Sequence, residues 1–128
     1  MMSLKAIQTD KAPSAVGPYS QAIVAGNLLF LSGLIGLEPN TASLVSGGFV
    51  AQLKQVFSNL QALLDAGSAK VNQIAKITVY LTDMNDFPVL NEMMKAYFKE
   101  PFPARTTIQV AALPKSAVVE LDVIVAIE

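Results

Sequence analysis

The chain of 128 residues contains no cysteine, no histidine and no tryptophan. Without cysteine it has no disulfide framework, no thiolate nucleophile and no thiolate metal site. Without histidine it also lacks the commonest metal ligand and the commonest general base at neutral pH. Ser-His-Asp and Cys-His catalytic machinery is therefore excluded. Any catalysis has to come from carboxylates, arginine or lysine, hydroxyls, backbone groups and bound water.

Charge is also scarce, because only 15% of the residues are charged whereas 52% are hydrophobic. Globular proteins usually carry about 25% charged residues, so few charged side chains are available to cover a monomer, and we expect an oligomer. The 9 basic and 10 acidic residues give a net charge of −1 without any basic run, which disfavours nucleic acid as a partner. The apolar stretches 22–37 and 118–127 are interrupted by polar residues. We therefore expect no membrane span, no signal peptide and a cytoplasmic location.

The length predicts a single domain, residues 1–128, that buries about two-thirds of its extended surface. Strands are predicted at 4–8, 19–24, 28–32, 74–81, 105–110 and 118–127 from their β-branched and alternating apolar residues. Gly26 and Asn27 predict a hairpin turn. Apolar residues at spacings of three and four predict one helix from residue 50 to a cap at Gly67, and another that begins at Asp83 or Asp86. This order predicts an α+β domain whose two helices cover one face of a mixed β-sheet, so that the other face needs a partner.

The scarce charge gathers near the C-terminal strands. The strand that begins at Arg105 places Arg105, Thr107 and Gln109 on one face. We predict that it pairs with the last strand as an antiparallel hairpin, which puts Thr107 near Glu120 and Arg105 near Asp122. Two interpretations are open. The group is either a structural ion pair on a solvated face, or Arg105 presents its planar fork to a ligand carboxylate while Glu120 holds a water or a proton.

Five short motifs extend over nearly the whole chain. They are Gly17-Pro18-Tyr19-Ser20-Gln21-Ala22, Gly26-Asn27-Leu28-Leu29-Phe30-Leu31-Ser32-Gly33, Leu81-Thr82-Asp83-Met84-Asn85-Asp86-Phe87 with Asn91, Pro103-Ala104-Arg105-Thr106-Thr107, and Leu113-Pro114-Lys115 ahead of Glu120. Together they resemble the RidA/YjgF family, also known as the L-PSP or imine deaminase family. The resemblance implies a fold like that of the small trimeric chorismate mutases. In that fold three subunits close a barrel-like centre with their sheets, and a cleft lies at each subunit interface.

The resemblance also implies an activity. Family members with the matching arginine hydrolyse reactive enamines and imines, such as 2-aminoacrylate, to 2-keto acids and ammonia without a cofactor or a metal. For this chain it implies a homotrimeric 2-iminobutanoate/2-iminopropanoate-type deaminase that acts on small 2-imino or 2-enamino acids. One alternative is a non-enzymatic sensor or carrier that binds 2-keto acids in the same cleft. An endoribonuclease is disfavoured by the charge balance.

The resemblance assigns roles to seven residues. Arg105 and Glu120 are the implied catalytic residues, the first to clamp the substrate carboxylate and the second to hold or activate the attacking water. The implied substrate-binding residues are Tyr19, Ser32, Gly33, Asn91 and Thr107. Purely structural roles stay open for Tyr19 as a packed aromatic, for Asn91 as a partner of backbone groups, and for Ser32 and Gly33 as the end of a strand.

Three positions depart from the family pattern. Thr107 stands where the best-known deaminases commonly have cysteine, and its β-branch changes the shape of the pocket. Leu34 stands where many relatives have glutamine, and Gly36 where many have proline. We expect these differences to affect the substrate range and the loop near Gly33.

Overall fold

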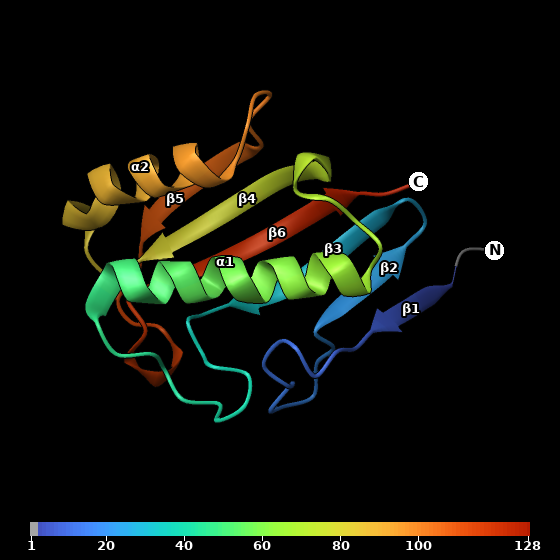
Figure 1. Cartoon of the computed structure of the whole chain (residues 1–128), viewed down its shortest axis with the longest axis horizontal. Helices are drawn as coiled ribbons and strands as arrows, with labels where there is room; N and C mark the ends of the chain where they lie inside the picture. Colours follow the sequence, from blue (N-terminus) through green and yellow to red (C-terminus); the bar gives the residue numbers. More distant parts are fainter. Residues whose placement is uncertain (1–2) are drawn as a thin grey trace.

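In the computed structural model, which describes residues 3–128, six strands form one mixed sheet and both helices cover the same face of it (Figure 1). The strand order across the sheet is β1-β2-β3-β6-β4-β5. The strands are β1 (Leu4–Ile7), β2 (Ala22–Ala25), β3 (Leu28–Leu34), β4 (Ile74–Leu81), β5 (Ala104–Gln109) and β6 (Val119–Ala126), and the helices are α1 (Gly48–Ala66) and α2 (Phe87–Tyr97). The predicted α+β class is confirmed. Across residues 3–128, no helix combines the length and the hydropathy that a membrane crossing requires.

Local sequence signals account for the hairpin and the helix ends. Gly26 takes a φ of 61° in the turn between β2 and β3, a left-handed conformation that glycine adopts without steric cost. The N–H of Gly67 donates to the carbonyl of Leu63 at 3.0 Å and ends α1 as predicted. Of the two predicted caps for the second helical segment, the carboxylate of Asp83 accepts the N–H of Asn85 at 2.9 Å. This cap opens a short 3-10 turn, Met84–Asp86, which leads directly into α2.

The core lies between the helices and the central strands. One stripe of α1 is completely buried, and it packs against the alternate residues of β6 and β4 that face the helices. These buried residues are Leu53, Val56, Leu60, Leu63, Leu64, Ile77, Val79, Leu81, Val119, Leu121, Val123 and Val125. Each such side chain contributes roughly 1.5–3 kcal/mol when it is buried. The stripe therefore holds α1 against the sheet and determines which residues of β6 face away from it.

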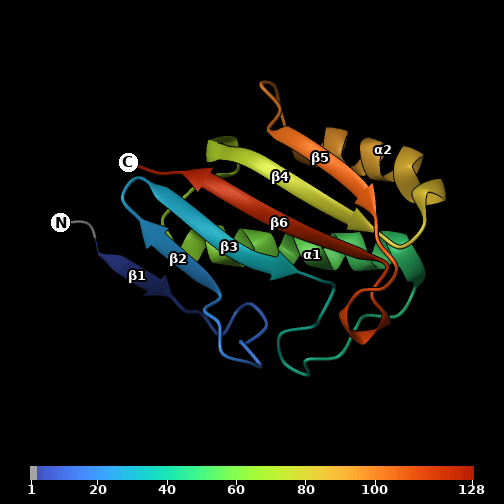
Figure 2. The same ribbon diagram turned by 180° about the vertical axis from the view of Figure 1, so that it is seen from behind.

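The other face of the sheet carries no helix (Figure 2). Phe30 and Ile108 lie on it and are 39% and 42% exposed. Thr78, Tyr80 and Asp122, on the same face, are half-buried. Large apolar side chains are thus exposed on a broad surface beside polar ones, as expected for a sheet that associates with another chain.

The predicted antiparallel hairpin between the last two strands is wrong. β4 lies between them, because it pairs with β5 in parallel and with β6 in antiparallel orientation. Two strands adjacent in sequence often pair directly. Here α2 supplies the crossover that a parallel pair needs, and β4, apolar on its helix-facing side, takes the central place between two neighbours. The connection from β5 to β6 is long enough to pass β4.

This topology separates the charged residues that the hairpin would have gathered. Arg105 is in register with Ile77 of β4, which is fully buried, so its side chain lies on the helix-covered face. Glu120 is in register with Tyr80, and Asp122 with Thr78, on the open face. Registered residues of neighbouring strands share a face. Arg105 and Glu120 of one chain therefore project from opposite faces of the sheet.

Candidate active site

The guanidinium of Arg105 is held against α2. Its Nη1 donates to Oδ1 of Asn91 at 2.8 Å and to the sulfur of Met94 at 3.5 Å. Its Cζ lies 5.3 Å from the centre of the Phe87 ring, within the range of a cation-π contact. These contacts orient a planar fork that suits a carboxylate, next to a pocket of about 300 Å³ whose wall includes Phe102.

Thr107 lies two residues further along β5, on the same face as Arg105. Its Oγ1 is buried and makes no hydrogen bond to any atom of residues 3–128. Buried hydroxyls nearly always have a partner, so this hydroxyl is available to a ligand or to a water. The β5 end of the sheet thus carries a cation with a defined orientation and a hydroxyl without a partner.

Glu120 lies in a second pocket, of about 140 Å³, at another part of the molecule. Its wall is formed by the N-terminal loop (residues 8–21, between β1 and β2), the end of β3 and the turn that precedes β6. The lining residues include Pro13, Ser14, Val16, Tyr19, Ser32, Gly33, Ile35, Leu37, Pro114 and Lys115. This pocket is separate from the one that Arg105 lines.

A bulge in β3 brings the backbone against Glu120. The register between β3 and β6 shifts between Leu31 and Leu34, so β3 extends past Ser32, its predicted end. A Cβ atom on Gly33 would lie only 2.5 Å from Oε2 of Glu120. Glycine at this position is therefore a steric requirement, because it lets the carboxylate lie directly over the backbone.

The electrostatics of Glu120 differ from those of an exposed carboxyl. Burial raises the pKa of Glu120 above its ordinary value, and the negative charge of Asp122 raises it further. A carboxyl with a raised pKa exchanges protons closer to neutral pH, which suits a general acid or base.

Tyr19 and Ser32 are tied to the N-terminal loop. Tyr19 is half exposed, and its Oη accepts the N–H of Val16 at 3.3 Å. The hydroxyl of Ser32 donates to the carbonyl of Ser20 at 2.6 Å. Ser32 thus holds the loop at β3, while Tyr19 forms part of the pocket wall.

The seven predicted site residues form two groups within one chain. Tyr19, Ser32, Gly33 and Glu120 line one pocket, Arg105 and Asn91 line the other, and Thr107 follows Arg105 on β5. Among residues 3–128, histidine, cysteine, aspartate and glutamate side chains form no group of three that could hold a metal ion.

Lys115 and Phe87 are among the residues to which the sequence assigned no role. Lys115 lines the Glu120 pocket, and its Nζ donates to the carbonyl of Ala42 at 3.1 Å. Phe87 contacts the Arg105 guanidinium. Both belong to motifs that the sequence showed, but their roles depend on contacts across the fold.

The structure shows what surrounds Leu34 and Gly36, two positions that depart from the family pattern. Leu34 is buried in the core. A Cβ on Gly36 would lie 2.9 Å from the backbone of Gln52 in α1, so the chain passes closely over that helix. The loop after Gly33 therefore rests directly on α1.

Known proteins share both the sequence and the fold of this chain. A family model described as endoribonuclease L-PSP matches residues 9–127. The 2-iminobutanoate/2-iminopropanoate deaminase of Dermatophagoides farinae is 43% identical over 128 residues, which is 100% of both chains. The mouse (Mus musculus) protein of the same name is 47% identical over 120 residues, which cover 94% of this chain and 89% of that protein.

Among solved structures, RidA from an Antarctic Psychrobacter is 50% identical and superposes with a TM-score of 0.92, over 96% of this chain and 99% of that one. The YjgF gene product of E. coli superposes with a TM-score of 0.88 at 38% identity, over 95% and 98% of the two chains. Both the sequence and the fold thus match known proteins over nearly their whole length. The chain belongs to the L-PSP family, which is also called the RidA/YjgF family.

Proposed function

We propose that this protein is a cytoplasmic imine deaminase that hydrolyses reactive 2-imino and 2-enamino acids to 2-keto acids and ammonia. One structural observation carries the proposal: a guanidinium held in a fixed orientation beside a hydroxyl without a partner, in a chain that also holds a half-buried carboxylate with a raised pKa. The chain is 43% and 47% identical, over nearly its whole length, to two proteins named 2-iminobutanoate/2-iminopropanoate deaminase, and this similarity supports the same activity.

We propose further that the protein is a homotrimer in which the Arg105 pocket of one copy meets the Glu120 pocket of the next. Two features support this arrangement. The two residues lie on opposite faces of one sheet, so a single chain does not offer both to one small substrate. The open face also exposes Phe30 and Ile108, which a neighbouring copy would bury.

In this proposal the substrate carboxylate binds the fork of Arg105, which Asn91 orients. The imine carbon is already electrophilic, so the site needs only to place a water and to move protons. Ionised Glu120 accepts a proton from the water as its oxygen bonds to the imine carbon, and passes that proton to the nitrogen, which gives a carbinolamine. Glu120 then moves the proton of the new hydroxyl to the amine nitrogen, so that the carbonyl forms as the carbon–nitrogen bond breaks and ammonia leaves the 2-keto acid. One imine and one water give one keto acid and one ammonia.

The direct test generates an imine with an amino-acid oxidase and follows its capture by semicarbazide. The purified protein is expected to speed the loss of the imine and to lower the yield of the semicarbazone. No acceleration over buffer would contradict the proposed activity. RNA cleavage by a rigorously nuclease-free preparation, lost when the pocket is mutated, would favour a nuclease instead.

Glu120→Gln is expected to abolish turnover while 2-keto acid binding persists, because the amide cannot take a proton from water. The raised pKa means that the folded state favours the protonated carboxyl. The stability from this preference is present below the unfolded pKa and is lost as pH rises through the folded pKa. The neutral amide is therefore expected to leave the free energy of unfolding at pH 7 unchanged or higher, as urea denaturation would show. A wild-type protein that binds keto acids but lacks turnover would favour the carrier.

Asp122→Asn is expected to move the acidic limb of the kcat/KM profile to lower pH. Turnover requires ionised Glu120, so activity falls as pH drops through its raised pKa. Removing the charge of Asp122 takes away one cause of that increase, and Glu120 then stays ionised at lower pH. Rates measured between about pH 4 and pH 8 would show the shift. An acidic limb at the same pH as in the wild type would indicate that the ionisation of another group controls it.

Gly33→Ala is expected to lower kcat/KM at least about tenfold, because the new methyl would displace the carboxylate of Glu120 from its position over the backbone. Gly17→Ala is the matched control, since a Cβ there would lie 3.5 Å from the Tyr19 ring, an ordinary contact distance. Steady-state kinetics and thermal melting of both variants would separate lost activity from lost stability. Wild-type kinetics for Gly33→Ala would mean that catalysis does not need the carboxylate of Glu120 in its observed position.

A further inference from the structure

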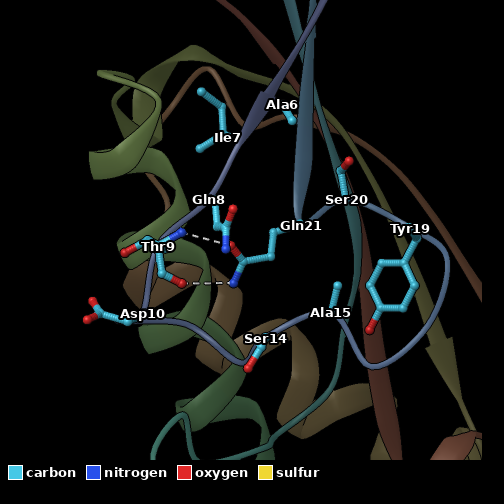
Figure 3. A pocket seen from close by; sticks show the side chains of 10 residues that line it. All are labelled: Ala6, Ile7, Gln8, Thr9, Asp10, Ser14, Ala15, Tyr19, Ser20 and Gln21. Atoms are coloured by element: carbon cyan, nitrogen blue, oxygen red, sulfur yellow. Dashed lines mark hydrogen bonds between the residues drawn. The ribbon is translucent and has the colours of Figure 1, made fainter.

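One buried side chain, Gln21, holds the N-terminal loop in place. Gln21 directly precedes β2 and is only 7% exposed. Its Oε1 accepts the N–H of Thr9 at 2.8 Å, and its Nε2 donates to the carbonyls of Thr9 at 3.0 Å and Pro13 at 2.7 Å. In Figure 3 the amide points toward Thr9, while Tyr19 lies at the far end of the same loop. One side chain thus connects two points of the loop to the sheet.

The loop that Gln21 holds is part of the Glu120 pocket. Pro13, Ser14, Val16 and Tyr19 all line that pocket, and all belong to the segment between β1 and β2. The segment has no helix or strand of its own between residues 8 and 21. Loops of this kind depend on individual side-chain bonds for their position.

The chemistry of the position calls for a primary amide. Gln21 uses an acceptor and a donor at the same end of one side chain: the acceptor takes one N–H, and the donor serves the carbonyls of Thr9, Ala12 and Pro13. Methionine has a similar length but offers neither strong group. Glutamate keeps an acceptor for Thr9, but at neutral pH it would turn a carboxylate oxygen toward the carbonyl of Pro13. Either change leaves backbone groups of the loop without their partners.

We propose that Gln21 is a positioning residue for the deaminase site, which it serves by holding Pro13 and Tyr19 in the wall of the Glu120 pocket. The kinetic part of this inference rests on the proposed function. Gln21 itself also lines this pocket, but its amide is engaged by the backbone of the loop. Losing the amide should therefore weaken substrate binding more than the chemical step, and should leave the proton transfers of Glu120 unchanged.

The test compares Gln21→Met with Gln73→Met. Gln73 is a matched control because its Oε1 accepts the N–H of Lys70 at 2.8 Å, in a turn that lines neither the Arg105 pocket nor the Glu120 pocket. Gln21→Met is expected to raise KM about tenfold while kcat changes less than about threefold, with the same pH profile. Hydrogen exchange of residues 10–16 should become faster. Gln73→Met should change neither KM nor this exchange.

The proposal is overturned if Gln21→Met keeps the KM of the wild type, or if the exchange of residues 10–16 stays as slow as before. A fall in thermal stability with unchanged kinetics would indicate a structural role alone. If Gln21→Met does not fold, Gln21→Glu removes the same Nε2 donor and should also raise KM. A wild-type protein without imine hydrolysis would contradict the proposed function, whereas hydrogen exchange would still show whether Gln21 holds the loop.

Discussion

Arg105→Ala is expected to lower kcat/KM for imine hydrolysis by about a thousandfold, which corresponds to about 4 kcal/mol of transition-state stabilisation. The guanidinium is the group that Asn91 and Phe87 orient beside the pocket, and alanine removes both its charge and its fork. Arg105→Lys should recover only part of the activity, because an ammonium keeps the charge without the bidentate geometry.

The control for this variant is a neighbouring cation. Lys95 lines the same pocket from α2. Lys95→Ala is therefore expected to keep kcat/KM within about threefold of the wild type, since an exposed charge without a fixed orientation contributes little. Steady-state rates from the semicarbazide assay would compare the three variants. Near wild-type activity of Arg105→Ala would remove this residue from the proposed mechanism.

Mixed assemblies of Arg105→Ala and Glu120→Gln chains are expected to regain about a third of the wild-type activity, although each variant alone is nearly inactive. If each site takes Arg105 from one copy and Glu120 from the next, a trimer that contains both kinds of chain keeps both residues intact at about one interface in three. A site built within one chain would always contain one substitution. Arg105 and Glu120 lie on opposite faces of the sheet, and this placement favours a site shared between two copies.

The mixing experiment needs two tags, so that only assemblies with both chains are purified and assayed. A mixture of Arg105→Ala with the double variant Arg105→Ala/Glu120→Gln is the matched control, because none of its interfaces contains an intact Arg105. Light scattering of the wild type would give the number of copies in the assembly. Purified mixed assemblies without activity would contradict the shared site, and a monomeric wild type would contradict the trimer.

Much of the fold was predictable because its signals are local. The apolar spacing of α1, the β-branched residues of β4 and the turn at Gly26 depend on neighbours within a few residues, and the structure places all three where the pattern predicts them. The face on which Arg105 and Thr107 lie together also followed from strand alternation.

The pairing of the last strands was not predictable in the same way. Alternation shows which residues of a strand share a face, but it does not show which strand lies beside it. The sequence therefore favoured a hairpin between β5 and β6, whereas the structure inserts β4. The bulge that brings Gly33 against Glu120 is equally nonlocal, because it depends on how β3 meets β6.

The sequence alone determined the residue types available for chemistry, the α+β class and the family motifs, since these depend on composition and short-range periodicity. Only the tertiary structure decided that Arg105 and Glu120 lie on opposite faces, that Gly33 is needed for close approach, and that Gln21 holds the loop beside Glu120. These features arise from contacts between segments far apart in the chain, and such contacts depend on strand order and on how the helices pack against the sheet.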